Sequence, residues 1–188
     1  MQEIEIEFKN ILNEKQYNQL REKWFNDQEP KKQTNYYFET DDFQLKNHQS
    51  ALRIRKKNDQ YIATLKQPRD EGLLETHDQL TDDEANQWFD NQVILKENIQ
   101  KQLSPLNIDL DQINYKGELT TYRLEKSVNN FIVVLDYSRY NGVEDFELEI
   151  ESPLYQEGKA FFEQILDEHN IEKQPSINKI QRFFNTLE

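Results

Sequence analysis

The stretch Glu3-Ile4-Glu5-Ile6-Glu7-Phe8-Lys9 decides the fold of this chain. Charged and apolar residues alternate strictly, which predicts a strand with one apolar face and one face of ionisable groups. Carboxylates on one strand face repel one another, so we expect a divalent cation or partner Arg and Lys residues to compensate them. Carboxylate oxygen is the ligand that Mg²⁺ prefers. An edge strand that carries charge against aggregation is the alternative interpretation.

Length and composition limit the class of protein. A chain of 188 residues predicts one domain, residues 1–188, with room for a substantial core. The absence of cysteine excludes disulfides, zinc–thiolate sites, iron–sulfur clusters and thiol nucleophiles. No apolar run approaches the roughly 20 residues of a membrane span, and a strand pattern begins at once, without a signal peptide. We therefore expect a cytoplasmic protein without a membrane partner.

The charge balance bears on partners. The formal net charge is −13, from 23 basic and 36 acidic residues, which argues against general binding to nucleic acid or anionic membranes. An acidic protein can still bind a small polyanion where its cations are gathered locally. The placement of Arg and Lys therefore matters more than their total.

Eight segments have the pattern of strands, and several repeat the alternation of the first. Arg53 and Arg55 share one strand face, and Glu147, Glu149 and Glu151 share another. The expected strands are 3–9, 34–40, 51–57, 60–67, 72–78, 118–126, 131–138 and 145–151.

Helical patterns lie between and after these strands. Residues 13–26 open with Asn13 and Gln16, as in a capping box, and 81–103 open in the same way with Thr81 and Glu84. The second segment is compatible with one helix or two. For residues 153–170 we expect Ser152 as the N-cap and Pro153 in the first turn. A short helix is expected at 177–186.

The apolar stripes of the helices decide how the strand faces are oriented. These stripes need an apolar sheet surface to cover, so the charged strand faces must look inward. Eight antiparallel strands can close around side chains or one small ligand. We therefore predict an α+β fold: an eight-stranded antiparallel β-barrel, or tunnel, with a charged interior and helices packed on the outside. Because an unpaired buried charge costs several kcal/mol, a charged tunnel implies a polyanion together with a metal.

Several motifs, in this order along the chain, resemble one known family. The E-x-E-x-K motif is Glu5-Ile6-Glu7-Phe8-Lys9. The chain resembles the CYTH domain, or triphosphate tunnel metalloenzyme, superfamily, and looks closest to the stand-alone CYTH proteins of Gram-positive bacteria. The further motifs are Leu52-Arg53-Ile54-Arg55, Thr64-Leu65-Lys66, Glu75, Arg123, Asp136, the row Glu147/Glu149/Glu151 and Ser176-Ile177-Asn178-Lys179.

The resemblance implies an activity, a cofactor and site residues. Family members have an eight-stranded antiparallel tunnel and act on triphosphates with Mg²⁺ or Mn²⁺. Glu5, Glu7 and Lys9 would be catalytic, and Glu5, Glu7, Glu147 and Glu149 would hold the metal and orient water. The residues expected to bind phosphate oxygens are Lys9, Arg53, Arg55, Lys66, Arg123 and Lys179. Secondary candidates are Glu3, Glu75, His77, Glu125, Asp136 and Glu151, with Glu151 expected at the tunnel rim.

The chain departs from the family pattern at two positions. Glu125 stands where a basic residue is frequent, and His77 stands where other members often have a second Glu. Both departures leave the choice of substrate and metal open. Arg139 and Arg182 are further candidates for a tunnel mouth.

Three functions remain in competition. The first is metal-dependent hydrolysis of inorganic triphosphate or a small organic triphosphate, favoured because nothing in the sequence indicates a base-binding pocket. The second is a class IV-type adenylyl cyclase, with the ribose 3′-oxygen as nucleophile. The third is a non-catalytic module that binds polyphosphate or a nucleotide. We expect a small triphosphate as the partner and a monomer or homodimer.

Overall fold

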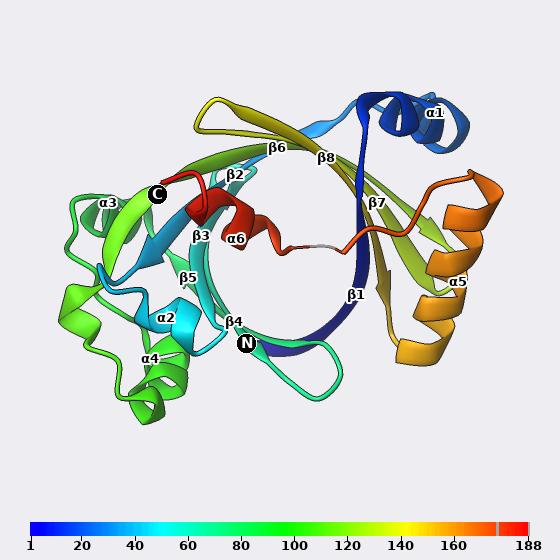
Figure 1. Cartoon of the computed structure of the whole chain (residues 1–188). Coiled ribbons are helices and arrows are strands. Elements are labelled where there is room, and N and C mark those ends of the chain that lie inside the picture. The colour runs from blue at the N-terminus through cyan, green and yellow to red at the C-terminus, as the bar shows by residue number, and fades with distance from the viewer. Residues whose placement is uncertain (176, 188) are drawn as a thin grey trace. The chain divides into compact units, whose positions relative to one another are not determined.

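The computed structural model describes residues 1–175 and 177–187, and within them eight strands form one sheet (Figure 1). Their order β1-β5-β4-β3-β2-β6-β7-β8 closes the sheet into a barrel. This confirms the predicted α+β fold with an eight-stranded antiparallel barrel. The strands are β1 (Gln2–Leu12), β2 (Lys31–Glu39), β3 (Ala51–Lys57), β4 (Gln60–Pro68), β5 (Leu73–Leu80), β6 (Asn114–Val128), β7 (Phe131–Tyr140) and β8 (Val143–Ser152).

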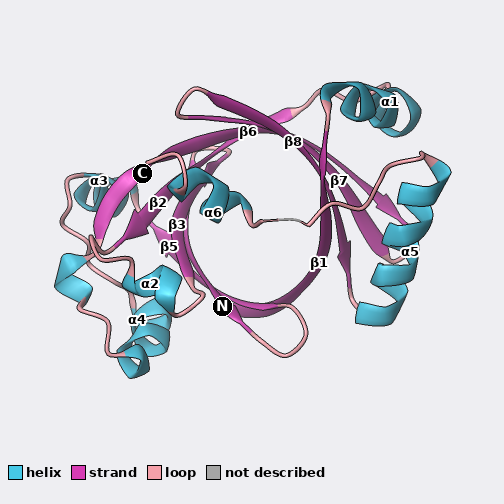
Figure 2. Cartoon of the chain, in the orientation of Figure 1, coloured by secondary structure: helices cyan, strands magenta, loops and turns pink. Residues whose placement is uncertain are grey.

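Six α-helices occur in the same described residues (Figure 2). The segment 81–103 contains two of them, and the four-residue helix α2 was not predicted. None of these helices is long and apolar enough to cross a membrane. They are α1 (Glu14–Phe25), α2 (Gln44–Asn47), α3 (Asp82–Phe89), α4 (Glu97–Leu103), α5 (Tyr155–Glu168) and α6 (Lys179–Phe184).

The missed helix α2 is stabilised by a contact from the preceding strand. The buried Glu39 carboxylate accepts hydrogen bonds from the backbone N–H groups of Leu45, at 3.0 Å, and Lys46, at 2.9 Å. These groups lie in the first turn, where a helix has no partners of its own. A four-residue segment has too few residues to show a helical period, so the sequence pattern could not reveal it.

The predicted caps agree with the structure at two helices and disagree at a third. Both reciprocal hydrogen bonds of a capping box are present at Asn13 of α1 and at Thr81 of α3. The prediction for Ser152 is wrong, because the N-cap of α5 is Leu154. Ser152 Oγ instead donates to Leu154 O at 2.7 Å and accepts from Leu154 N at 3.2 Å, so its side chain closes the loop before the helix.

The chain divides into two compact units, which we describe separately. Unit 1 comprises residues 1–4 and 33–118, and unit 2 comprises residues 5–32 and 119–188. In unit 1, Leu52 and Ile54 of β3 are buried in one cluster with Trp88 of α3 and Ile99 of α4. The apolar face of β3 therefore packs toward the helices, and Arg53 and Arg55 alternate onto the opposite face.

Unit 2 has the same division of faces. Leu148 and Ile150 of β8 are buried in one cluster with Leu20 of α1 and Phe162 of α5. Glu147 and Glu149 alternate with them and so lie on the opposite face of β8. Within each unit the helices cover the apolar strand faces, and the charged side chains lie on the opposite faces of the same strands. The sequence pattern predicted this division.

Candidate active site

Strand register in unit 2 assembles charged side chains from four strands. Arg123 of β6 is paired with Asp136 of β7, and Asp136 is paired with Glu147 of β8. Lys9 of β1 is paired with Glu149 of β8. Because directly paired residues project to the same face of a sheet, alternation in each strand is enough to bring these groups together.

Asp136 and Arg123 form the centre of this set. The fully buried Asp136 carboxylate accepts two hydrogen bonds from Arg123, from Nε at 2.8 Å and from Nη2 at 2.7 Å. Arg123 Nη2 also donates to Glu149 Oε2 at 2.6 Å. Burial acts to raise the pKa of Asp136, but Arg123 and Lys179 hold it below its usual value. The two hydrogen bonds from Arg123 to Asp136 fix the plane of the guanidinium.

Helix α6 adds two cations to the set. Lys179 Nζ lies 2.5 Å from Asp136 Oδ2 and 3.2 Å from a carboxylate oxygen of both Glu147 and Glu149. Arg182, one turn further on, donates to Glu147 Oε2 at 2.7 Å. Burial opposes the charged forms of both side chains. The three carboxylates nevertheless raise the pKa of Lys179 above its usual value, and Glu147 and Asp145 raise that of Arg182. Ser176 of the predicted Ser176–Lys179 motif lies outside the described residues.

The approach to α6 is tied to β1. Asn10, which is fully buried, donates from Nδ2 to Glu172 O at 3.2 Å and accepts from Gln174 N at 2.7 Å. Arg182 also donates from Nε to Asp145 Oδ2 at 2.9 Å. Hydrogen bonds therefore hold the chain at Glu172 and Gln174, before Lys179, and at Arg182, after it.

Three buried carboxylates of unit 2 could hold a metal ion. Asp136, Glu147 and Glu149 each offer an oxygen within 4.8 Å of the others. Burial and the neighbouring Glu149 raise the pKa of Glu147 to about 7, although Lys179 and Arg182 lower it. In the part of the chain that the structure describes, Glu147 Oε1 has an ion pair with Lys179 but no hydrogen bond. Carboxylate oxygens are the donors that a hard divalent cation prefers.

The E-x-E-x-K motif lies beside this cluster in the same unit. Lys9 Nζ donates to Glu7 Oε1. Burial acts to lower the pKa of Lys9, but Glu7, Glu149 and Glu147 raise it above its usual value. Glu5 and Glu7 are not members of a group of acidic or histidine ligand atoms within 4.8 Å, among the described residues. The structure thus joins Glu147 and Glu149 to Asp136, and the metal role of Glu5 and Glu7 stays a prediction.

Unit 1 has its own charged set on strands β3, β4 and β5. Lys66 Nζ lies 2.5 Å from Glu75 Oε1, and Arg53 Nη2 lies 3.8 Å from the same atom. His77 Nε2 lies 3.0 Å from Glu3 Oε1 and 3.5 Å from Glu75 Oε2. Glu3, Glu75 and His77 form a second group whose ligand atoms lie within 4.8 Å of one another.

Two arginines of unit 1 differ in how well the protein satisfies them. Arg55 donates from Nε to Asn35 Oδ1 at 2.9 Å. Arg53 Nε is buried and has no hydrogen-bond acceptor among the described residues. A buried donor without an acceptor costs about 1–3 kcal/mol, so this N–H group is able to donate to a further oxygen.

The remaining candidates lie at the edge of these sets. Glu125 is exposed. Glu151 is partly buried, 3.9 Å from Arg123 Nη1, and burial raises its pKa above the usual value. Arg139 forms an exposed ion pair with Glu144 at 3.1 Å.

Arg182, in contrast, contacts the acidic cluster directly. In the sequence, only its spacing of three residues from Lys179 could have indicated this contact.

The structure has a closed eight-stranded barrel in which carboxylates and cations share the same strand faces. These are the features that the sequence resemblance to the CYTH domain implies. The family model for the CYTH domain matches residues 3–184, so the chain belongs to the CYTH family. The resemblance stated from the sequence motifs is confirmed.

The chain is also similar to individual proteins and solved structures. The chain is 44% identical over 189 residues to "Putative triphosphatase YjbK" of Bacillus subtilis (strain 168), across 97% of this chain and 95% of the relative. A crystal structure described as a "putative adenylate cyclase" from Bacillus halodurans has a TM-score of 0.93 and 40% identity, covering 97% of this chain and 98% of that one. A Hippeastrum protein described as a "putative adenylyl cyclase" with a dominant triphosphatase activity shares the fold, with a TM-score of 0.72 and 20% identity over 98% and 96% of the two chains.

Proposed function

We propose that this CYTH protein is a metal-dependent phosphohydrolase that acts on inorganic triphosphate or a small organic triphosphate. One observation carries the proposal: in unit 2, three carboxylates within 4.8 Å of one another are interleaved with Arg123 and Lys179. Phosphoryl transfer needs mainly positioning and neutralisation of charge, which such a set can supply. The name of the Bacillus subtilis relative, "Putative triphosphatase YjbK", supports the same substrate class.

Phosphate oxygens would be bound by cations that protein groups orient. In unit 2, Asp136 engages Nε and Nη2 of Arg123, whereas Nη1 has its nearest paired carboxylate, Glu151, only at 3.9 Å. Arg123 can therefore donate from Nη1 to a phosphate without losing Asp136. In unit 1, Arg53 offers its unsatisfied Nε. Lys9, Arg55, Lys66 and Lys179 complete the proposed phosphate-binding residues.

Asp136, Glu147 and Glu149 would hold Mg²⁺ or Mn²⁺ in unit 2. A bound divalent ion neutralises phosphate charge and lowers the pKa of a coordinated water. We assign Glu5 and Glu7 to the orientation of the attacking water, with Lys9 holding Glu7 in place. Glu3, Glu75 and His77 form the secondary acidic group of unit 1.

The product separates hydrolysis from cyclisation. The Bacillus halodurans relative is described as a "putative adenylate cyclase", and the same residues could direct the ribose 3′-oxygen of ATP in place of water. Purified protein is incubated with triphosphate, ATP or thiamine triphosphate and either Mg²⁺ or Mn²⁺. We expect phosphate release, most rapidly from inorganic triphosphate. Cyclic AMP with pyrophosphate would establish the cyclase instead.

A non-catalytic role is the remaining alternative. Calorimetry with triphosphate in each metal would then show tight binding while none of the three substrates was consumed. Such a result would contradict the proposed hydrolase. We favour the enzyme because a pure phosphate binder gains nothing from the additional carboxylates Glu5 and Glu7.

A further inference from the structure

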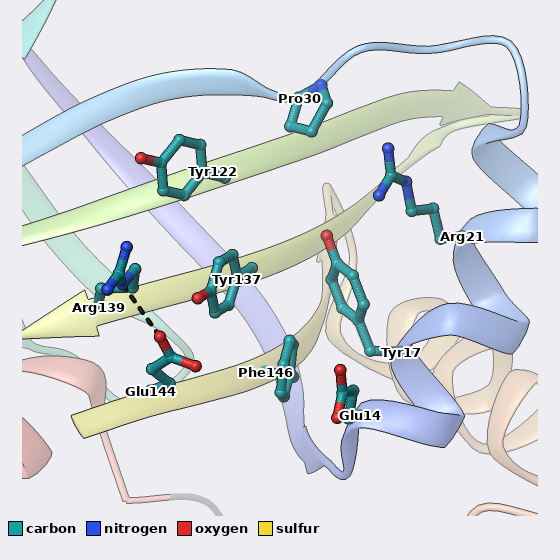
Figure 3. Close-up of a pocket in the computed structure, with 9 residues that line it drawn as sticks. All are labelled: Glu14, Tyr17, Arg21, Pro30, Tyr122, Tyr137, Arg139, Glu144 and Phe146. Carbon is teal, nitrogen blue, oxygen red and sulfur yellow. Dashed lines mark ion pairs between the residues drawn. The ribbon is translucent and has the colours of Figure 1, made fainter.

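The outer strand face of unit 2 carries a pocket that the charged set does not use. It has a volume of about 480 Å³ and lies between α1 and strands β6 to β8 (Figure 3). Small-molecule sites have volumes of this order. Tyr122, Tyr137 and Phe146 are direct sequence neighbours of Arg123, Asp136 and Glu147, so they project to the opposite face of the same strands.

An aromatic row forms the wall of this pocket. Strand register pairs Tyr122 with Tyr137 and Tyr137 with Phe146. The ring centroids of these pairs are 5.7 and 5.1 Å apart, with interplanar angles of 22° and 17°. The ring of Tyr17 from α1 extends the row, 4.8 Å from Phe146.

Stabilisation of the sheet by cross-strand aromatic pairs explains only part of this arrangement. The next row on the same face, Leu124, Leu135 and Leu148, is buried in the cluster that includes α1 and α5. Tyr122 and Tyr137, in contrast, remain partly exposed. Helices therefore cover one row completely and leave the aromatic row open.

The pocket has three unused donors among the described residues, and its lining also includes two carboxylates, those of Glu14 and Glu144. Among the described residues, Arg21 forms no ion pair or hydrogen bond, and the hydroxyl groups of Tyr17 and Tyr122 form no hydrogen bond. Figure 3 shows Arg21 and the Tyr17 hydroxyl directed toward the same gap beside Tyr137. Burial raises the pKa of Tyr17, so its phenol remains a neutral donor. Arg139 differs, since Glu144 already pairs with it at 3.1 Å.

We propose that this pocket binds a nucleoside phosphate, with the base against the Tyr122 and Tyr137 rings and the phosphate at Arg21. Planar bases stack on aromatic side chains, and a guanidinium pairs with phosphate oxygens in a two-point contact. The pocket is thus a second ligand site, on the strand face opposite the acidic cluster of unit 2. It stands independently of the triphosphatase activity.

The test measures binding of AMP by calorimetry in metal-free buffer with saturating inorganic triphosphate. Triphosphate occupies the charged residues and has no ring that could stack. We expect wild-type protein to bind one AMP, and Tyr122→Ala and Arg21→Gln each to bind it about ten-fold or more weakly, the loss expected for one stacked base or one charged contact. Lys15→Gln, an exposed change on the same helix, is the matched control and should bind like wild type.

Adenosine and phosphate, tested separately, should each bind more weakly than AMP. The proposal is overturned if triphosphate abolishes AMP binding, if both variants bind like wild type, or if phosphate alone binds as tightly as AMP. Should Tyr122→Ala fail to fold, Arg21→Gln decides alone, because Arg21 forms no ion pair or hydrogen bond with the described residues that its replacement would break. Turnover is not measured, so an inactive protein can still pass this test.

Discussion

The charged sets of unit 1 and unit 2 differ in how far protein groups satisfy their arginines. In unit 2, Arg123 has three short hydrogen bonds to Asp136 and Glu149, between 2.6 and 2.8 Å. In unit 1, the nearest paired carboxylate oxygen of Arg53 is 3.8 Å away, and its Nε has no acceptor among the described residues. Arg123 is held by short hydrogen bonds to protein groups, whereas Arg53 keeps a donor that no described residue accepts.

This difference suggests a division of labour. In unit 2 the carboxylates of Asp136, Glu147 and Glu149 lie within 4.8 Å of one another, and this geometry is the basis for the proposed metal ion. The set of unit 1 has fewer short contacts at Arg53 and therefore retains more of its capacity to bind phosphate. Substitutions in the two units test this division, from the largest expected effect to the smallest.

Asp136→Ala should cause the largest loss of stability of any of these substitutions. It removes one of the two buried carboxylates, Asp136 and Glu149, that both Arg123 and Lys179 contact. Breaking a buried ion pair costs about 3–5 kcal/mol. Urea denaturation measures the loss of unfolding free energy. Glu163→Ala removes the exposed pair with Lys173 and should cost under about 1 kcal/mol. Equal losses in the two variants would refute the central role of Asp136.

Glu5→Gln and Glu7→Gln should reduce kcat roughly a hundred-fold with little change in triphosphate binding. An interaction that matures in the transition state affects turnover more than ground-state affinity, and losing one costs about this much. Initial rates over a range of triphosphate concentrations separate kcat from KM. Melting temperatures must first show folded variants. Parental kcat in both would make these carboxylates structural and remove unit 2's proposed chemical role.

Arg53→Ala should weaken triphosphate binding about 10- to 100-fold, the worth of a hydrogen bond to a charged group, with little loss of stability. Arg123→Ala should weaken binding too, but it should also destabilise the fold because the fully buried Asp136 then loses two of its hydrogen bonds and keeps only Lys179 among the described residues. Calorimetry and urea denaturation on both variants provide the comparison. If Arg53→Ala destabilised the protein as much as Arg123→Ala, the contrast between the units would be lost.

His169 should produce the smallest effect, because it lies outside both charged sets. It accepts a hydrogen bond from Trp24 Nε1 at 3.2 Å, and burial, followed by Lys23, lowers its pKa. The unfolded chain therefore binds the proton more readily, so stability is lost as pH falls below the ordinary histidine pKa of about 6.5. His169→Gln keeps an acceptor and should reduce the slope of melting temperature between about pH 7 and 5. An unchanged slope would contradict this assignment.

Much of the architecture was predictable because alternation is a local property. All eight strands were predicted, and the Glu147/Glu149 row and the Arg53/Arg55 pair have the expected faces. Ser152 and α2 were not predicted correctly. Each depends on a contact absent from any periodic pattern: the return of the Ser152 side chain to its own loop, and Glu39 reaching the N-terminus of α2.

The sequence by itself determined the class of fold and the residue types of the site. Strand period and charge can be read from short stretches of sequence, and motif order can be read along the chain. Only the tertiary structure decided which of those groups meet. Strand register placed Asp136 between Arg123 and Glu147, and the path to α6 brought Arg182 onto Glu147. The pocket beside Tyr122 likewise depends on the position of α1, whose residues Tyr17 and Arg21 line it. Such contacts depend on register and helix position, which residues far apart in the sequence set together.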